Sequence, residues 1–238
     1  MNLVESTVLN GCSEMNIPAG ANALHCFSEY ANMLSEQNKV MNLTAIEGEE
    51  NIARLHFLDC AALLQFAGFE NRSVIDIGTG AGFPGLPLKI LEPSIKLTLF
   101  DSLEKRIKFL EDTCEKLNIT DCMFIHGRAE ESAHDEKLRE QFDICVSRAV
   151  ARLSLLCEIC LPFVKQGGVM IAMKGPEPEA ETEEAANAIR LLGGSIKEVR
   201  RYTVPGTDIV HTAVIIQKNG ITSGKYPRKW SQIKKSSL

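Results

Sequence analysis

From residue 73 onward, short runs of β-branched and apolar residues alternate with longer amphipathic runs. The short runs predict strands, and they lie at residues 74–77, 96–100, 123–125, 143–146 and 169–173. The longer runs have helical spacing, and they lie at residues 87–91, 103–117, 130–140, 153–164 and 177–192. Such alternation is typical of a parallel sheet with helices on both faces. The sequence therefore predicts a doubly wound α/β fold.

The two ends of the chain add to this pattern. Apolar positions at helical spacing cover residues 22–66, with a break at 42–48, and predict a helical extension before the sheet. Two extended segments, 195–204 and 212–217, flank Pro205 and Gly206 and predict an antiparallel hairpin at one sheet edge. We thus expect a mostly parallel sheet of seven strands.

The chain has 238 residues, of which 45% are hydrophobic, and one large α/β domain can form from it. Within that domain we expect a helical cap over residues 1–70, a core over 73–218 and a basic tail over 219–238. Residues near Met1 show no basic start followed by an apolar stretch, and no apolar run approaches the roughly 20 residues that cross a bilayer. We expect a soluble, cytoplasmic protein without a membrane partner.

The cysteines lie within apolar or helical patterns, which favours reduced thiols in the core over disulfides. Cys157 and Cys160 form a lone CxxC pair, and a zinc site needs two further ligands at comparable spacing. The five histidines are scattered, so we expect no metal.

A glycine-rich turn follows the first predicted strand directly. Asp76 stands at the strand tip, and Gly78, Gly80 and Gly82 follow at every second position. In this fold the junction faces the ligand crevice, and glycine lets the backbone turn tightly and a ligand approach closely. A carboxylate here repels a pyrophosphate and attracts the ammonium of a methionine moiety. This frame favours S-adenosylmethionine, whereas the shifted GxGxxG frame that starts at Gly80 leaves a dinucleotide as the alternative.

Three further positions extend this site. Asp101 ends the second strand, where a carboxylate accepts hydrogen bonds from ribose hydroxyls in either cofactor. Ala129 and Glu130 follow the third strand, where this fold usually contacts adenine; a plain helix start is the alternative. Arg148 follows the fourth strand, where the acceptor meets the methyl group, and we predict that its planar fork holds an electron-rich acceptor. A structural ion pair is the other interpretation.

The net charge of −5 argues weakly against a nucleic-acid partner, but the charge is uneven. The tail combines basic residues with Tyr226 and Trp230, a composition that suits phosphate contacts and base stacking. A solvated, frayed tail is the alternative. The basic residues are Lys225, Arg228, Lys229, Lys234 and Lys235.

With these residues in view, the chain resembles the bacterial small-subunit ribosomal RNA guanine-N7 methyltransferases, the glucose-inhibited division protein B family. The resemblance rests on motifs spread over nearly the whole chain. They are Asn42-Leu-Thr-Ala-Ile46, His56-Phe-Leu-Asp59, residues 76–89, Phe100-Asp-Ser102, Gly127-Arg-Ala-Glu130, Ser147-Arg-Ala-Val-Ala151, Lys174-Gly175 and Tyr226-Pro-Arg-Lys229. The sequence departs from the family pattern at Leu55, Cys60, Trp230 and Ser231.

The resemblance implies a Rossmann-like class I methyltransferase that uses S-adenosylmethionine to methylate N7 of one guanine in 16S ribosomal RNA. It implies cofactor contacts at Gly78, Phe83, Ala129, Glu130 and Arg148, with Asp101 at the ribose. It also implies RNA contacts at Arg128, Lys174, Arg228 and Lys229, with ribosomal proteins as further partners. Two alternative functions remain open: a cofactor-binding ribosome assembly factor without transferase activity, and a nicotinamide-dependent oxidoreductase.

Overall fold

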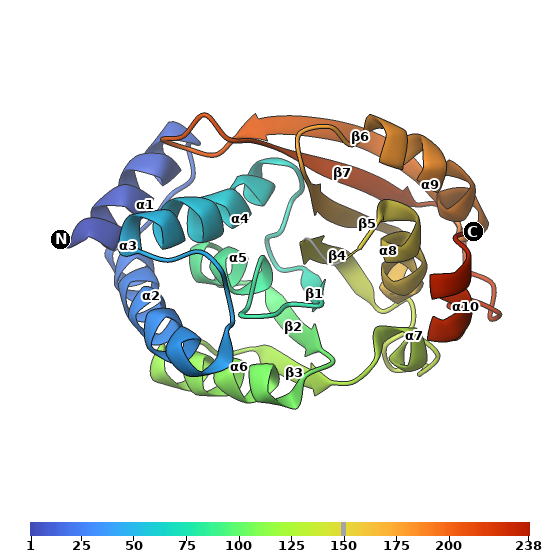
Figure 1. Ribbon diagram of the computed structural model, residues 1–238, viewed down its shortest axis with the longest axis horizontal. Helices are drawn as coiled ribbons and strands as arrows, with labels where there is room; N and C mark the ends of the chain where they lie inside the picture. Colours follow the sequence, from blue (N-terminus) through green and yellow to red (C-terminus); the bar gives the residue numbers. More distant parts are fainter. Residues whose placement is uncertain (149–150) are drawn as a thin grey trace.

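The computed structural model describes residues 1–148 and 151–238, and a seven-stranded sheet runs through these residues (Figure 1). The strand order is β3-β2-β1-β4-β5-β7-β6. Strands β1 to β5 run parallel to one another, and β7 is antiparallel to both β5 and β6. The strands are β1 (Ser73–Ile77), β2 (Lys96–Asp101), β3 (Cys122–His126), β4 (Phe142–Arg148), β5 (Val164–Lys174), β6 (Gly194–Thr203) and β7 (Val210–Lys218).

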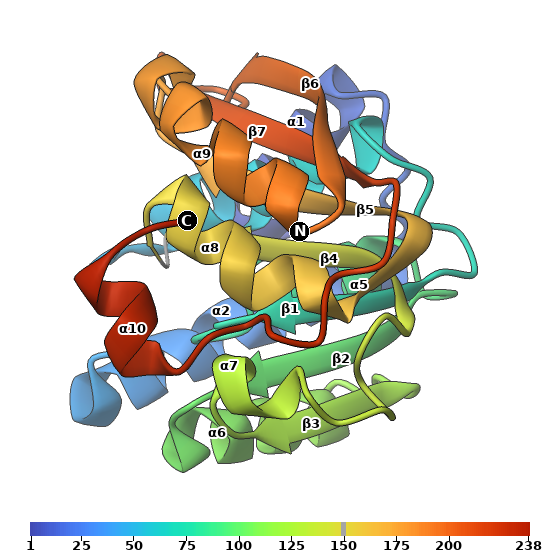
Figure 2. The ribbon, with the colours of Figure 1, turned by 90° about the vertical axis from the view of Figure 1, so that its right-hand side faces the viewer.

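Helices cover both faces of the sheet, as the two ribbon views show (Figures 1 and 2). One face carries α5 (Gly85–Leu91), α6 (Glu104–Lys116) and the N-terminal helices α1 (Leu3–Glu14), α2 (Ala21–Met41), α3 (Glu49–Ile52), η1 (Ala53–Leu58, a π-helix), α4 (Asp59–Ala61) and η2 (Ala62–Gln65). The other face carries α7 (Ala129–Ser132), α8 (Leu153–Cys160), η3 (Leu161–Phe163), α9 (Glu179–Leu191) and the C-terminal α10 (Trp230–Lys235).

The residue pattern explains why both faces are covered. Successive strand residues point to opposite sides, so Val74 of β1 belongs to the core under α5 and Ile75 to the core under α8. Helix α6 buries Ile107, Leu110 and Cys114, which recur at helical spacing on one face. The predicted doubly wound α/β fold, with its helical extension and antiparallel edge hairpin, is confirmed.

The prediction of a helix over residues 130–140 is wrong. Helix α7 ends at Ser132, and turns follow. Asp135 uses its side chain to accept from the backbone N–H of Lys137, and Glu140 adopts a positive φ of 54°. Local side-chain to backbone bonds of this kind compete with helix, although the residues themselves are good helix formers.

All eight cysteines are free thiols, and seven of them are buried. Among the described residues, no group of three or more His, Cys, Asp or Glu side chains has the geometry of a metal site. Over the same part of the chain, no helix is long and apolar enough to cross a membrane.

Candidate functional site

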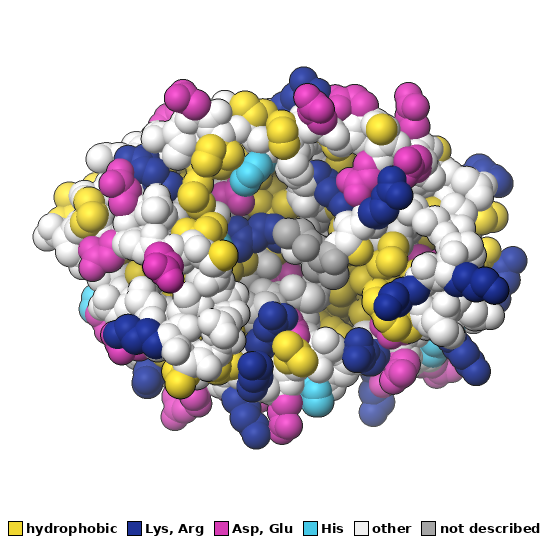
Figure 3. Space-filling model, in the orientation of Figure 1, with side chains coloured by type: hydrophobic (Ala, Val, Ile, Leu, Met, Phe, Trp, Pro, Cys, Tyr) yellow, Lys and Arg dark blue, Asp and Glu magenta, His cyan; other side chains and the backbone are white. Residues whose placement is uncertain are grey.

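A pocket of about 400 Å³ opens at the carboxyl ends of β1, β2 and β4. In Figure 3 this face of the molecule is hollowed near its centre, and Lys and Arg side chains surround the hollow. We call it the first pocket, and it brings together six of the predicted site residues. They are Gly78, Asp101, Arg128, Ala129, Glu130 and Arg148. The other lining residues were not predicted to contact the cofactor, although Trp230 was noted in the tail and Phe100 and Ser102 belong to a family motif. They are Ile77, Phe100, Ser102, Arg106, Ile159 and Trp230.

The glycine loop forms one wall of this pocket. Gly78, Gly80 and Gly82 adopt φ angles of 71°, 62° and 105°, a region that L side chains disfavour. A Cβ on Gly82 would lie 2.5 Å from the Tyr30 hydroxyl, so this position also requires glycine for space. Of the three, only Gly78 lines the pocket, and the other two shape the turn behind it.

Five backbone N–H groups of the loop, those of Gly78, Thr79, Gly80, Gly82 and Phe83, are engaged within the protein. Those of Gly78 and Thr79 donate to the Phe100 carbonyl at 2.9 and 3.1 Å, and those of Gly82 and Phe83 donate to the Thr79 carbonyl. A dinucleotide site needs such N–H groups free to bind pyrophosphate. The loop therefore suits a cofactor without phosphates.

Asp76 lies beneath the loop and does not line the first pocket. Its side chain is fully buried, and Oδ2 accepts from Thr79 Oγ1 at 2.7 Å and from the Gly85 N–H at 2.8 Å. Burial raises the pKa of this carboxyl to about 7. Asp76 thus braces the loop and occupies the N-terminus of α5, a different placement from the predicted contact with a methionine ammonium.

Asp101 does line the pocket. Its Oδ2 accepts from the Gly80 N–H at 2.9 Å, and its Oδ1 accepts from the Leu103 N–H at 2.9 Å. Arg106 forms an ion pair with it at 3.3 Å. Oδ2 accepts from both Gly80 and Arg106, whereas Oδ1 keeps a second lone pair that can accept from a ligand hydroxyl.

Arg148 lies at the centre of a hydrogen-bonded network beside the pocket. Its guanidinium donates to His56 Nδ1 at 2.8 Å and to the Leu55 carbonyl at 3.2 Å, and lies 3.4 Å from Asp59 Oδ2. The same guanidinium lies 4.8 Å above the Phe83 ring, which stacks on His56 at 4.2 Å. Phe83 is buried and supports Arg148 from below, and it does not line the first pocket.

His56 is held in one protonation state. Burial and the adjacent Arg148 lower the pKa of its imidazole to about 3, so the ring is neutral. Since Nδ1 accepts from Arg148, the proton lies on Nε2, which donates to Thr44 Oγ1 at 2.8 Å.

A second pocket, of about 470 Å³, adjoins the first at Arg148. Here Asp59 Oδ1 accepts from Tyr202 Oη and from His211 Nδ1, both at 2.8 Å. The bond to Asp59 raises the pKa of His211. The complete lining is Ile46, Leu55, His56, Asp59, Arg148, Met173, Lys174, Gly175, Ile209 and His211. His56 and Asp59 were visible to sequence reasoning only as a family motif, and nothing local singled out Tyr202 or His211.

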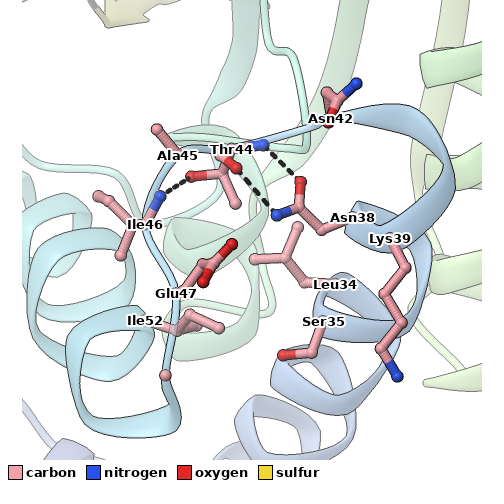
Figure 4. A pocket seen from close by; sticks show the side chains of 11 residues that line it. Leu34, Ser35, Asn38, Lys39, Asn42, Thr44, Ala45, Ile46, Glu47 and Ile52 are labelled. Carbon is pink, nitrogen blue, oxygen red and sulfur yellow. Dashed lines mark hydrogen bonds between the residues drawn. The ribbon is translucent and has the colours of Figure 1, made fainter.

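The loop between α2 and α3 forms a wall shared by this second pocket and an outer hollow (Figure 4). Asn38 fixes the loop with two bonds to the backbone of Thr44, each 2.9 Å long. The Thr44 hydroxyl also accepts from the Ile46 N–H, and Ile46 lines both hollows. Residues 42–46 thus support the His56–Arg148 network from outside.

The four basic residues expected to contact RNA are placed differently from one another. Arg128 and Lys229 are exposed. Lys174 Nζ donates to the Ala151 carbonyl and pairs with Glu181 at 3.1 Å, and Arg228 binds the buried Glu158 through its backbone N–H, Nε and a terminal nitrogen. The latter two side chains are engaged within the protein. The predicted motif around Arg148 continues into Ala149 and Val150, which lie outside the described residues.

Solved structures share this architecture at low identity. TrmN from Thermus thermophilus aligns with a TM-score of 0.51 at 18% identity, over 67% of this chain and 48% of that chain. The pyocyanin biosynthetic protein PhzM aligns with a TM-score of 0.57 at 13% identity, over 81% and 61%. Together with the sheet order, these likenesses define the Rossmann-like fold of class I methyltransferases.

Sequence comparison then identifies the family. The GidB family model, described as rRNA small subunit methyltransferase G, matches residues 23–208. Ribosomal RNA small subunit methyltransferase G of Clostridium tetani is 45% identical over 233 residues, which cover 97% of this chain and 98% of that protein. The protein of the same name from Alkaliphilus metalliredigens is 46% identical over 92% of each chain. The chain belongs to the GidB family of rRNA small subunit methyltransferases, as its motifs predicted.

Proposed function

We propose that the protein transfers the methyl group of S-adenosylmethionine to N7 of one guanine in 16S ribosomal RNA. The observation that carries the proposal is the meeting of two pockets at Arg148, one of them bounded by the glycine loop and Asp101. Family membership supplies the class of reaction and of substrate.

The residues of the first pocket fit this cofactor. Asp101 would accept from the ribose hydroxyls, Ala129 and Glu130 would line the adenine, and Gly78 would lie against the methionine portion. A nicotinamide dinucleotide fits less well, because the loop N–H groups that pyrophosphate needs are bonded and the buried Asp76 carboxyl occupies the start of α5. The family also argues against an oxidoreductase.

The second pocket is the proposed place for the guanine. Met173, Ile209 and Leu55 offer apolar contacts to a base, while Lys174 and His211 add polar groups. Guanine presents O6 as an acceptor beside N7, and an arginine N–H can donate to O6 while the N7 lone pair stays free to attack the methyl group. Arg148 lies where it borders both ligands.

The chemistry needs little acid–base work from the protein. Guanine N7 carries an in-plane lone pair and no proton, and the bound sulfonium supplies an activated methyl group. The task of the chain is therefore to align the base and to stabilise the positive charge that develops on the purine. His56 serves the alignment, since a ring with a pKa of about 3 orients Arg148 without exchanging protons near neutral pH.

RNA contacts outside the pockets are assigned to the exposed Arg128 and Lys229. Lys174 and Arg228, which are engaged within the protein, act in positioning. The substrate is small-subunit ribosomal RNA, as free RNA or together with ribosomal proteins, and the cytoplasm is the expected location.

The test is to incubate the purified protein with methyl-labelled S-adenosylmethionine and either deproteinised 16S RNA or small subunits. Nucleosides are then separated and identified by mass spectrometry. The proposal predicts label on 7-methylguanosine and its loss in Arg148→Lys, because an ammonium cannot replace the fork. Label on adenosine or cytidine would refute the N7 assignment, and binding of cofactor without any label would favour a non-catalytic assembly factor.

A further inference from the structure

Trp230 reaches the first pocket from the C-terminal tail, far in sequence from every other lining residue. It is the first residue of α10, and in the ribbon views this helix lies beside α7 and α8 (Figures 1 and 2). Its indole lines the first pocket together with Ala129, Glu130 and Ile159. It also borders a neighbouring hollow of about 470 Å³ between α7 and the tail, so it stands as a wall between the two.

The tail before Trp230 is firmly anchored. Arg228 makes three bonds to Glu158, which is 1% exposed, at 2.9, 2.8 and 2.6 Å. His134 Nε2 donates to the Pro227 carbonyl at 2.9 Å, and Arg139 donates to the carbonyls of Tyr226 and Thr222. These partners lie 70 to 93 positions away in the sequence.

The helix after Trp230 is anchored as well. Ile233 is 2% exposed and belongs to the core under α8. Anchors on both sides hold the indole against the pocket, even though 36% of the residue is exposed. An aromatic ring that is fixed before binding loses little conformational entropy when a ligand stacks on it.

The indole lies at the end of the first pocket where the adenine of the cofactor is expected. Ala129 and Glu130 follow β3, on the far side of Asp101 from the glycine loop, where this fold places an adenine. Indole and purine are flat π systems that stack, and Ile159 adds apolar surface nearby.

We propose that Trp230 forms a wall of the adenosine end of the cofactor pocket and stacks on the adenine ring, which makes the C-terminal tail part of the cofactor site. The identity of the ligand rests on the proposed function. Because Trp230 is the single tryptophan of the chain, its fluorescence reports on this position alone.

The experiment titrates the full-length protein with S-adenosylhomocysteine and measures tryptophan fluorescence and calorimetric heat in parallel. Stacking predicts quenching that saturates with the calorimetric dissociation constant. Adenosine should quench too, and L-methionine should not. Trp230→Ala should raise the dissociation constant about 10- to 100-fold, the range of one base–aromatic stack. Trp230→Phe should raise it only a few-fold, and the exposed tail control Lys225→Ala should leave it unchanged.

The outcomes separate this inference from the proposed function. The wild type could bind S-adenosylhomocysteine in calorimetry without fluorescence quenching, and Trp230→Ala could bind it equally well. That result would overturn the stacking of Trp230 on adenine and leave the cofactor assignment intact. Quenching by methionine or by a guanine-containing oligonucleotide, but not by adenosine, would also overturn the stacking. Absence of calorimetric binding by the wild type would overturn the cofactor assignment itself. Circular dichroism melts of the variants show whether each folds.

Discussion

Replacing Arg148 by methionine should destabilise the fold as well as abolish activity. The guanidinium is the donor for His56 Nδ1 and the Leu55 carbonyl, and it faces Asp59, which is 1% exposed. Each buried acceptor left without a donor costs about 1–3 kcal/mol. Removing one partner of a buried ion pair costs about 3–5 kcal/mol in all. For a domain of this size, that loss lowers the melting temperature by about 10 °C.

The assay is urea unfolding of the cofactor-free protein, followed by circular dichroism. Arg152→Met is the matched control, because Arg152 pairs with Glu184 on the surface, with 70% and 53% of the side chains exposed. The control should lose no more than about 1 kcal/mol. Adding Asp59→Asn to Arg148→Met should recover about 1 kcal/mol or more of the loss. Equal losses of unfolding free energy in Arg148→Met and Arg152→Met would refute the Arg148 network as a source of stability.

Three further changes test other parts of the site. Gly82→Ala should lower the urea midpoint of unfolding much more than Gly80→Ala. Both glycines have a positive φ, but only a Cβ at position 82 would collide with Tyr30. Equal effects of the two variants would contradict the steric argument. Burial raises the pKa of Asp76 to about 7, so its contribution to stability is full below about pH 4 and is lost as pH rises through 7. Between pH 5 and 8 the melting temperature should therefore fall less in Asp76→Asn than in the wild type. The same dependence of melting temperature on pH in both proteins would count against a buried ionisable Asp76. Asp101→Asn should weaken S-adenosylhomocysteine binding by about 10- to 100-fold in calorimetry, and unaltered affinity would remove Asp101 from the ribose contact.

The sheet could be predicted because its determinants are local. Strands such as β1 are buried on both faces and therefore appear as continuous apolar runs, and helices such as α6 show one apolar stripe. The carboxyl ends of parallel strands meet at one edge, so the sequence also indicated that Gly78, Asp101 and Arg148 would converge.

What could not be predicted depends on partners distant in the sequence. Spacing placed Asp76 at the strand tip, but Thr79 and the Gly85 N–H hold its carboxyl beneath the loop. Composition alone left the tail as either a frayed end or an RNA contact. Its structure is instead decided by Glu158 and Arg139, and no periodicity in residues 219–238 encodes those partners.

The network of the second pocket was hidden for the same reason. Tyr202 and His211 reach Asp59 from 143 and 152 positions away, on the edge hairpin. Each of them is an ordinary strand residue by local pattern. The antiparallel pairing of β6 and β7 makes Tyr202 and His211 neighbours and brings both to Asp59.

The central claim is that the first pocket holds an adenosyl cofactor with its sulfur facing the guanine pocket across Arg148. A crystal structure of the complex with S-adenosylhomocysteine measures this most directly. We expect density with the ribose at Asp101, the adenine beside Glu130 and the sulfur open toward Arg148. Density for the adenosyl group in the second pocket, or a closed glycine loop with no ligand at saturating concentration, would contradict it.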